Sequence, residues 1–457
     1  MKARLAQIDP PDFGMPDSMP ELPAALYPAR IERLREAASR RGYDCVLVYA
    51  DREHSANLSH LTGFDPRFEE AVLILGQEGD PAILAGNECY GMAGAAPLPM
   101  RRILFQDLSL PSQPRDRSKP LREILADEGI RRGGHIGVVG WKTFAERSLL
   151  DVPAYLVDCL RELVGPNGLV ENATDLLIDP AEGLRTTNEP EQLAAFEYAS
   201  CHTSEGIRRL LLGLRPGMTE QQAVGLLGWN GMPLSCHLML TAGPRATLGL
   251  LSPSDRQIER GDRFTTAFGV WGALTCRAGF VVEDARELPA GIGDYVERLV
   301  GPYFEAVGEW YGALRIGVSG GELQAIIDRR LGDPFFGIFL NPGHLLGLDE
   351  WVSSPVARGS TATLRSGMAM QVDIIPATGT EYFTTNIEDG IALADADLRS
   401  ELGDRYPGAW ARIEARRAFM KDALGIDLHP DVLPLSNLAA WLPPFLLGPE
   451  RAMTLRS

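Results

Sequence analysis

Short apolar runs that alternate with helix-like segments constrain the fold of the first part of the chain. The runs are typical of buried strands and lie at residues 45–49, 71–75, 81–85 and 136–139. Apolar residues at helical spacing predict a helix at 28–41, and a further helical segment is expected at 119–127. This alternation is typical of a small α/β domain. We therefore predict a first domain over residues 1–188.

The rest of the chain predicts an α+β domain and a C-terminal extension. A long helix is expected over about residues 189–212, and Thr219 with Gln222 has the spacing of a capping box for a second helix. The strand-like runs of this part are residues 264–268, 278–282, 368–375 and 387–393. Helices on one side of a mostly antiparallel sheet would occupy residues 189–399. Residues 400–457 would form an extension that either covers its own domain or serves as a lid or dimer arm.

Length and charge exclude several classes of protein. At 457 residues the chain is too long for one compact core, which agrees with two domains. Its formal net charge of -17 disfavours binding to nucleic acid or to an anionic membrane surface. No apolar run reaches the roughly 18 to 20 residues that span a bilayer. The six cysteines include no CxxC pair, and no apolar signal-peptide core opens the sequence. These features predict a reduced, cytoplasmic protein with no nucleic-acid or membrane partner.

Three polar residues in apolar surroundings indicate a site of chemistry. His344 lies in a glycine-flanked loop, Asp373 lies inside a strand-like run, and Glu388 lies at the head of another. A carboxylate in a buried strand is costly unless it is paired, hydrogen-bonded or metal-bound. The three residues therefore indicate an acid–base cluster or a metal cluster.

The order of motifs along the chain is more specific than any one of them. The motifs are NLSHLTGF at residues 57–64, Arg215-Pro216-Gly217, Gly243-Pro244, Gly261-Asp262, His344 to Gly347, Gly367-Met368 and Ile387-Glu388-Asp389. In this order they resemble the creatinase and aminopeptidase P (Xaa-Pro peptidase-like) family over about residues 28–395. The resemblance implies a creatinase-like N-terminal α/β domain, a pita-bread catalytic domain and a homodimer that acts on a small-molecule substrate.

The resemblance carries the family's metal ligands over only in part. In its metallopeptidases two Asp, one His and two Glu hold two divalent ions. The His matches His344, the first Glu matches Asp373, and the second Glu matches Glu388. Asp373 is one methylene shorter than the family's Glu.

Both Asp positions of the family fall on alanine. The first Asp position falls on Ala267. The second falls on Ala278 by direct count, or on Ala273 if the segment GVWGALT at residues 269–275 matches the family's Gly-Tyr-Trp-Ser-Asp-Leu-Thr. The two auxiliary His positions fall on Leu250 and Trp351. Two divalent ions about 3.5–4 Å apart need several anionic ligands, so we expect no two-metal centre.

Two chemical routes stay open for the retained residues. One His and two carboxylates could hold a single ion, since three protein ligands and a water are a known catalytic set. Creatinase, by resemblance, implies a metal-free route that uses a His and carboxylates. Because its His position is Leu250 here, the acid or base would be His344 or His237.

Two residues next to the lost ligand have both a functional and a structural interpretation. The guanidinium of Arg277 would either fill the former metal space and pair with Asp373 or Glu388, or lie on the surface of the sheet. Cys276 would be a nucleophile only with a base beside it, and is otherwise a core cysteine.

Three more residues complete the predicted site. By resemblance, Arg67 lies in a loop of the first domain that reaches the active site of a partner protomer; otherwise it is a solvated loop charge. Trp271 and Trp351 would wall the pocket as substrate-binding residues, or pack in the core.

The sequence therefore predicts a creatinase-like hydrolase of a C–N bond in a small amino-acid-derived, guanidino or amide substrate, working without metal. His344, Asp373 and Glu388 would polarise the substrate and transfer protons. Two alternatives stay open. One is a catalytically inactive pita-bread protein that binds a ligand or partner. The other is a mononuclear, metal-dependent Xaa-Pro peptidase.

Overall fold

The computed structural model describes residues 2–456, which form two compact units. Residues 22–185 make one unit, and the described residues on either side of that range make the other. The described residues before residue 22 pack with the second unit by their contacts, and the domain bounds 1–188, 189–399 and 400–457 stay a prediction. Among the described residues, no helix has the length and apolar character needed to cross a membrane.

The unit of residues 22–185 is a mixed sheet with helices. Its strands are β2 (Cys45–Ala50), β3 (Ala71–Gly76), β4 (Ala82–Ala85), β5 (Arg101–Leu104), β6 (His135–Val139) and β7 (Leu169–Asn172), in the order β5-β4-β3-β2-β6-β7. Its α-helices are α1 (Leu26–Arg40), α2 (Ala56–Thr62), α3 (Cys89–Met92), α4 (Leu121–Asp127), α5 (Ala154–Val164) and α6 (Asp175–Ile178). All six residues of β2 are buried, as an apolar run between two covered faces requires. The expected α/β arrangement is therefore present.

The second unit is built on an antiparallel sheet. Its strands are β8 (Met239–Ala242), β9 (Arg263–Val270), β10 (Ala273–Phe280), β11 (His344–Leu345), β12 (Ala369–Asp373), β13 (Asn386–Leu393) and β14 (Val432–Pro434). The order is β11-β12-β13-β10-β9-β8, and β14 also pairs with β13. The α-helices of this unit are α7 (Pro190–Gly213), α8 (Glu220–Val224), α9 (Gly301–Ala313), α10 (Gly320–Leu331), α11 (Ala396–Arg405) and α12 (Pro407–Asp422).

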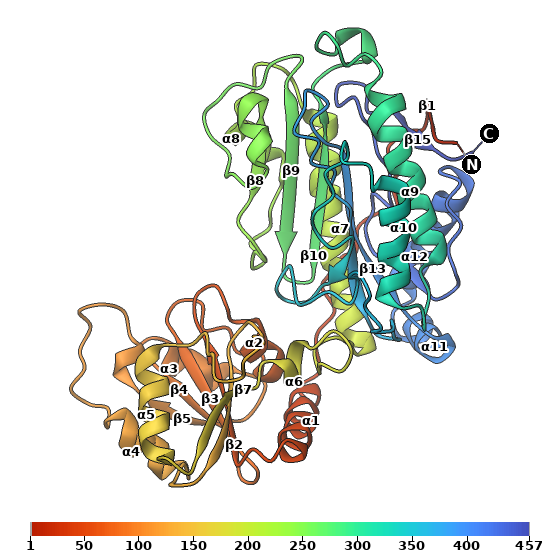
Figure 1. Ribbon diagram of the computed structural model, residues 1–457. Helices are drawn as coiled ribbons and strands as arrows, with labels where there is room; N and C mark the ends of the chain where they lie inside the picture. The colour runs from red at the N-terminus through yellow and green to blue at the C-terminus, as the bar shows by residue number, and fades with distance from the viewer. Residues whose placement is uncertain (1, 457) are drawn as a thin grey trace. The chain divides into compact units, whose positions relative to one another are not determined.

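Helix α7 packs against β9 and β10, and Figure 1 shows these elements side by side. The capping box predicted at Thr219 and Gln222 is present at the start of α8, where each residue's side chain hydrogen-bonds the other's backbone N–H. The sheet and its helices confirm the predicted α+β fold class.

The two ends of the chain meet within this second unit. Strand β1 (Arg4–Gln7) pairs antiparallel with β15 (Arg451–Thr454), and Figure 1 shows these two strands side by side. The tail also supplies α11, α12 and β14, and Trp441 is fully buried in the core of this unit. Residues beyond 400 thus complete the packing around the sheet.

Candidate active site

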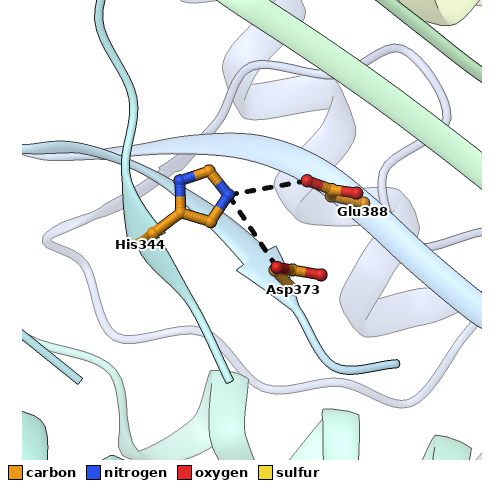
Figure 2. Close-up of side chains that lie close together, drawn as sticks. All are labelled: His344, Asp373 and Glu388. Atoms are coloured by element: carbon orange, nitrogen blue, oxygen red, sulfur yellow. Dashed lines mark ion pairs between the residues drawn. The ribbon is translucent and has the colours of Figure 1, made fainter. Parts of the chain in front are cut away.

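Three neighbouring strands bring the predicted polar residues together. Asp373 at the end of β12 lies directly opposite Glu388 of β13, and His344 of β11 lies opposite Gln371 of β12. Residues opposite each other in a sheet share a face, as do residues two apart on one strand. The side chains of His344, Asp373 and Glu388 therefore point to one side of the sheet (Figure 2).

The imidazole of His344 is the centre of this cluster. Its Nε2 lies 3.5 Å from Oε1 of Glu388 and 4.0 Å from Oδ2 of Asp373. Its Nδ1 donates to the carbonyl oxygen of Leu345 at 3.2 Å, which turns Nε2 toward the carboxylates. One donor atom from each of the three residues lies within 4.8 Å of the others, and all three residues are buried.

A glycine before His344 makes this close packing possible. Gly343 has a φ of +134°, and a Cβ there would lie 3.0 Å from the Trp310 ring and 3.1 Å from the carbonyl oxygen of Gln371. A larger residue would push β11 away from β12. The close packing of β11 against β12 thus explains why a glycine precedes His344 in the motif.

A fourth polar residue, Glu350, joins the cluster and was not among the predicted site residues. Its Oε1 lies 3.1 Å from Nε2 of His344, and its side chain is 25% exposed. It is carried by the loop that follows β11. Backbone hydrogen bonds between Leu345 and Ser353 and between Val352 and Leu345 close that loop. No local pattern marks Glu350, because only this loop closure brings it back over His344.

The carboxylates control the ionisation of the cluster. Burial alone would lower the pKa of His344, but the Glu350 and Glu388 carboxylates outweigh burial and raise this pKa to about 10. Burial raises the pKa of Asp373, and the charge of Glu388 raises it further. Burial also raises the pKa of Glu388. Without another cation, the imidazole is thus the positive charge among these acids.

Two side chains on the strands near Glu388, those of Cys276 and Ala267, carry no oxygen atom that could bind a metal ion. Ala267 of β9 and Glu388 of β13 both lie opposite Cys276 of β10. Ala267 and Cys276 belong to a small apolar cluster with Leu274, against which Cys236 packs. The Cys276 thiol hydrogen-bonds the Glu388 carboxylate, and burial raises the pKa of this thiol. The neighbourhood is apolar and neutral.

The interpretation of Arg277 as a partner of Asp373 or Glu388 is corrected by the structure. Alternate residues of a strand point to opposite faces, so Arg277 lies behind the sheet when Cys276 faces the site. Its Nη2 lies 2.8 Å from Oδ2 of Asp389, and its Nε donates to the Trp441 carbonyl oxygen. Its side chain is 1% exposed. Arg277 joins the sheet to the C-terminal tail.

The remaining predicted residues lie in different surroundings. Trp351 is 39% exposed, and its ring stacks on the His344 ring with centroids 4.2 Å apart. Trp271 is half-buried in the turn between β9 and β10. His237 is exposed, with its Nε2 2.7 Å from the carbonyl oxygen of Leu250. Arg67 lies in the unit of residues 22–185, where its Nε donates to the Arg52 carbonyl oxygen. The role of Arg67 at a partner's site stays a prediction.

Comparisons with known proteins rest on structure. No protein-family model matches the sequence, and no curated protein does either. The prolidase of Pyrococcus horikoshii aligns with a TM-score of 0.62 at 16% identity, over 80% of this chain and 95% of that chain. The Xaa-Pro dipeptidase of Bacillus anthracis aligns with a TM-score of 0.61 at 17% identity, over 81% and 96%. The X-Pro aminopeptidase of Thermotoga maritima aligns with a TM-score of 0.61 at 16% identity, over 80% and 95%.

This chain has the pita-bread fold of the creatinase and aminopeptidase P family. The predicted resemblance is thereby confirmed at the level of fold. The alanines that the sequence resemblance matched to the family's two Asp ligands, Ala267 and Ala278 or Ala273, are all buried. Among the described residues, one group of His and carboxylate side chains, His344 with Asp373 and Glu388, has donor atoms close enough together to hold an ion.

Proposed function

We propose that this chain hydrolyses a C–N bond of a small amino-acid-derived, guanidino or amide substrate without a metal ion. The observation that supports this most directly is the buried contact of the His344 Nε2 with carboxylates from two adjacent strands. Prolidase and X-Pro peptidase structures of the same fold agree with chemistry at an amide bond.

The residues of the cluster suit the two proton transfers that hydrolysis needs. One group must accept a proton from the attacking water, and one must deliver a proton to the leaving nitrogen. Asp373 and Glu388 lie opposite each other, and His344 contacts both, so a proton has a short path between them. The partly exposed side chains of Glu350 and Trp351 mark the side from which a small substrate would enter.

A mononuclear Xaa-Pro peptidase is the second candidate. It is favoured by the three donor atoms within 4.8 Å of one another and by the names of the structural neighbours. A single divalent ion would polarise the substrate carbonyl and lower the pKa of a bound water. A metal-free hydrolase would rely on the His344 imidazole for polarisation instead.

The test is a substrate panel of Xaa-Pro dipeptides, guanidino acids and simple amides, assayed with Mn²⁺ and with chelator. His344→Ala and Glu388→Ala should each lower turnover by at least about 100-fold, the scale of acid–base catalysis. Glu381→Gln is the control, because Glu381 is 74% exposed and pairs with Arg263. Unchanged turnover in both site variants would refute the proposal. Ligand-induced thermal stabilisation without turnover would favour an inactive binding protein.

A further inference from the structure

We infer that the free edge of β1 binds an extended, acidic peptide segment of a partner protein, which adds to the β1–β15 sheet as a third strand. Edge strands accept such segments because their unpaired N–H and C=O groups form a template for one more strand. This surface belongs to the second unit, and the proposed hydrolysis at the His344 cluster does not use it. The inference therefore goes beyond the proposed function and does not depend on it.

The pairing of β1 with β15 leaves one edge of β1 open. The two strands form a two-stranded sheet, and no third strand among the described residues pairs with β1. In an antiparallel pair, opposite residues alternate between exchanging two hydrogen bonds and exchanging none. Leu5 lies opposite Met453, whose N–H donates to the Leu442 carbonyl oxygen instead. The backbone groups of Leu5, and of Gln7 two residues on, therefore point to the open edge.

The open edge already binds one acceptor. Ala3 lies two residues before Leu5, so its N–H belongs to the same row, and this N–H donates to Oε1 of Glu305 at 3.0 Å. A side-chain carboxylate thus occupies the place that a peptide carbonyl oxygen would take in a third strand. Because Glu305 lies in α9, this contact also shows that the open edge faces α9, and Figure 1 shows β1 and β15 beside this helix.

A groove of about 1020 Å³ lies between this edge and the start of α9. Residues 2–5 line it together with Gly301 and Pro302 of α9, and the buried side chains of Phe445 and Leu455 add apolar surface. Val296, from a π-helical turn, also lines it, and such turns are rare and frequent at functional sites. Pockets for small molecules measure about 300–1,000 Å³, so this groove has room for a longer, extended ligand.

Positive charge gathers on the strand side of the groove, although the chain as a whole has a net charge of -17. Lys2, Arg4 and Arg456 are exposed and line the groove, and the Arg4 Nε donates to the Arg456 carbonyl oxygen at 2.9 Å. Of the two carboxylates in the lining, Glu305 is engaged by the strand edge, which leaves Glu297 against three cations. This charge balance selects acidic side chains in the bound segment.

The arrangement predicts the pattern of the bound segment. Side chains of a strand alternate between two faces, so one row would meet the apolar lining and the other would meet the cations. The probe is therefore a fluorescein-labelled peptide of alternating Glu and Val, titrated with the full-length chain and followed by fluorescence anisotropy. It should bind at least about tenfold more tightly than a peptide of alternating Lys and Val. N-methylation at adjacent Glu and Val residues, which removes strand hydrogen bonds, should weaken it about tenfold.

Two variants test the edge and the charge separately. Gln7→Pro removes an N–H that points to the open edge and keeps the bonds to β15, so the Glu–Val peptide should bind at least about threefold more weakly. Arg4→Glu replaces an attraction by a repulsion and should weaken binding about tenfold and reduce its salt dependence. Lys119→Glu is the control, because it makes the same change of net charge in the unit of residues 22–185. It should bind like the wild type.

A further control separates this groove from the candidate active site. His344→Ala should bind the Glu–Val peptide like the wild type, and a loss of binding there would place the peptide at the His344 cluster and overturn the inference. Thermal unfolding checks that each variant folds.

Other results would also overturn the inference. These are no saturable binding by the wild type, equal affinity for the Glu–Val and Lys–Val peptides, and affinity unchanged by Gln7→Pro and by N-methylation. Sedimentation of the free chain tests a different occupant of the edge. A concentration-dependent dimer that Gln7→Pro abolishes would assign the edge to a second copy of this chain instead of a peptide.

Discussion

Charge burial is the main energetic problem at the scale of single residues. Asp373 and Glu388 are each 4% exposed, and an isolated buried charge costs several kcal/mol even after relaxation. The His344 imidazole, or a cation beside it, compensates part of that cost. On the other face of the sheet, Arg277 and Asp389 compensate each other directly. One face is thus adapted to chemistry and the other to stability.

The Arg277–Asp389 pair should contribute strongly to stability. Asp389 also accepts hydrogen bonds from Ser436 and from the Ala440 backbone, so it anchors the C-terminal tail. Asp389→Ala would leave Arg277 buried without its charge partner, and we expect a loss of about 3–5 kcal/mol in the free energy of unfolding. Urea denaturation of the full chain measures this.

The matched control for that prediction is the surface pair of Arg263 and Glu381, where Glu381→Ala should cost no more than about 1 kcal/mol. Equal losses of unfolding free energy in the two variants would show that the buried Arg277–Asp389 pair stabilises the chain no more than a surface ion pair does.

The sequence indicates some residues of the site and not others. His344, Asp373 and Glu388 are recognisable because each lies in a motif whose order resembles a family. Glu350 is carried by an irregular loop, and its approach to His344 depends on backbone contacts seven or more residues apart in sequence. The sequence also cannot show which way the Arg277 side chain points, because that depends on which face of β10 is turned toward the carboxylates.

At the scale of elements, a buried ionic network joins α7 to α12. Glu197 of α7 contacts Arg416 at 2.8 Å and Arg412 at 2.6 Å, and Arg416 also donates to Asn437. Burial alone would raise the pKa of Glu197, but the two guanidinium groups outweigh it and hold this pKa below its usual range. This network fixes the C-terminal helices against the long helix.

This network predicts a pH dependence of stability. Because the pKa of Glu197 is lower in the folded chain, its contribution is complete above the unfolded pKa of about 4.3 and is lost as pH falls toward the folded value. Urea midpoints between pH 7 and pH 3.5 should fall less steeply for Glu197→Gln than for the wild type. The variant should also be less stable at pH 7, because Arg416 loses its counter-charge. Parallel pH profiles would contradict the assignment.

Long elements agree with the sequence patterns better than short ones. The helix expected over residues 189–212 is α7, and the run at 387–393 lies within β13. The run expected at 278–282 overlaps only the end of β10, which begins at Ala273, because the hairpin turn at Gly272 has no distinctive turn pair. Strand β11 has two residues, too few for any periodicity.

At the scale of the whole molecule, pairing between the chain ends could not be predicted from local patterns. Strands β1 and β15 are more than 400 residues apart, and no periodicity connects them. Ile8 packs against the core that contains Trp441, and the Trp441 indole N–H donates to the Ile8 carbonyl oxygen. The first residues therefore act as part of the second unit.

Removing residues 2–8 should destabilise that unit. The deletion removes the hydrogen-bonded partner of β15 and the cover over Trp441, so we expect a loss of at least about 2 kcal/mol in the free energy of unfolding. Urea denaturation followed by Trp fluorescence measures it. Removal of Lys2 alone is the control and should change little. A fully stable deletion variant would show that β1 contributes nothing.

The number of ions that one chain binds tests the central claim most directly. Purified full-length protein is dialysed against excess Mn²⁺, and bound metal is measured by inductively coupled plasma mass spectrometry. A site with Ala267 and Ala278 in place of two carboxylates should bind no more than one ion per chain. If one ion binds, His344→Ala should abolish the binding. Two ions per chain would contradict the account, because they would require ligands that these alanines cannot provide.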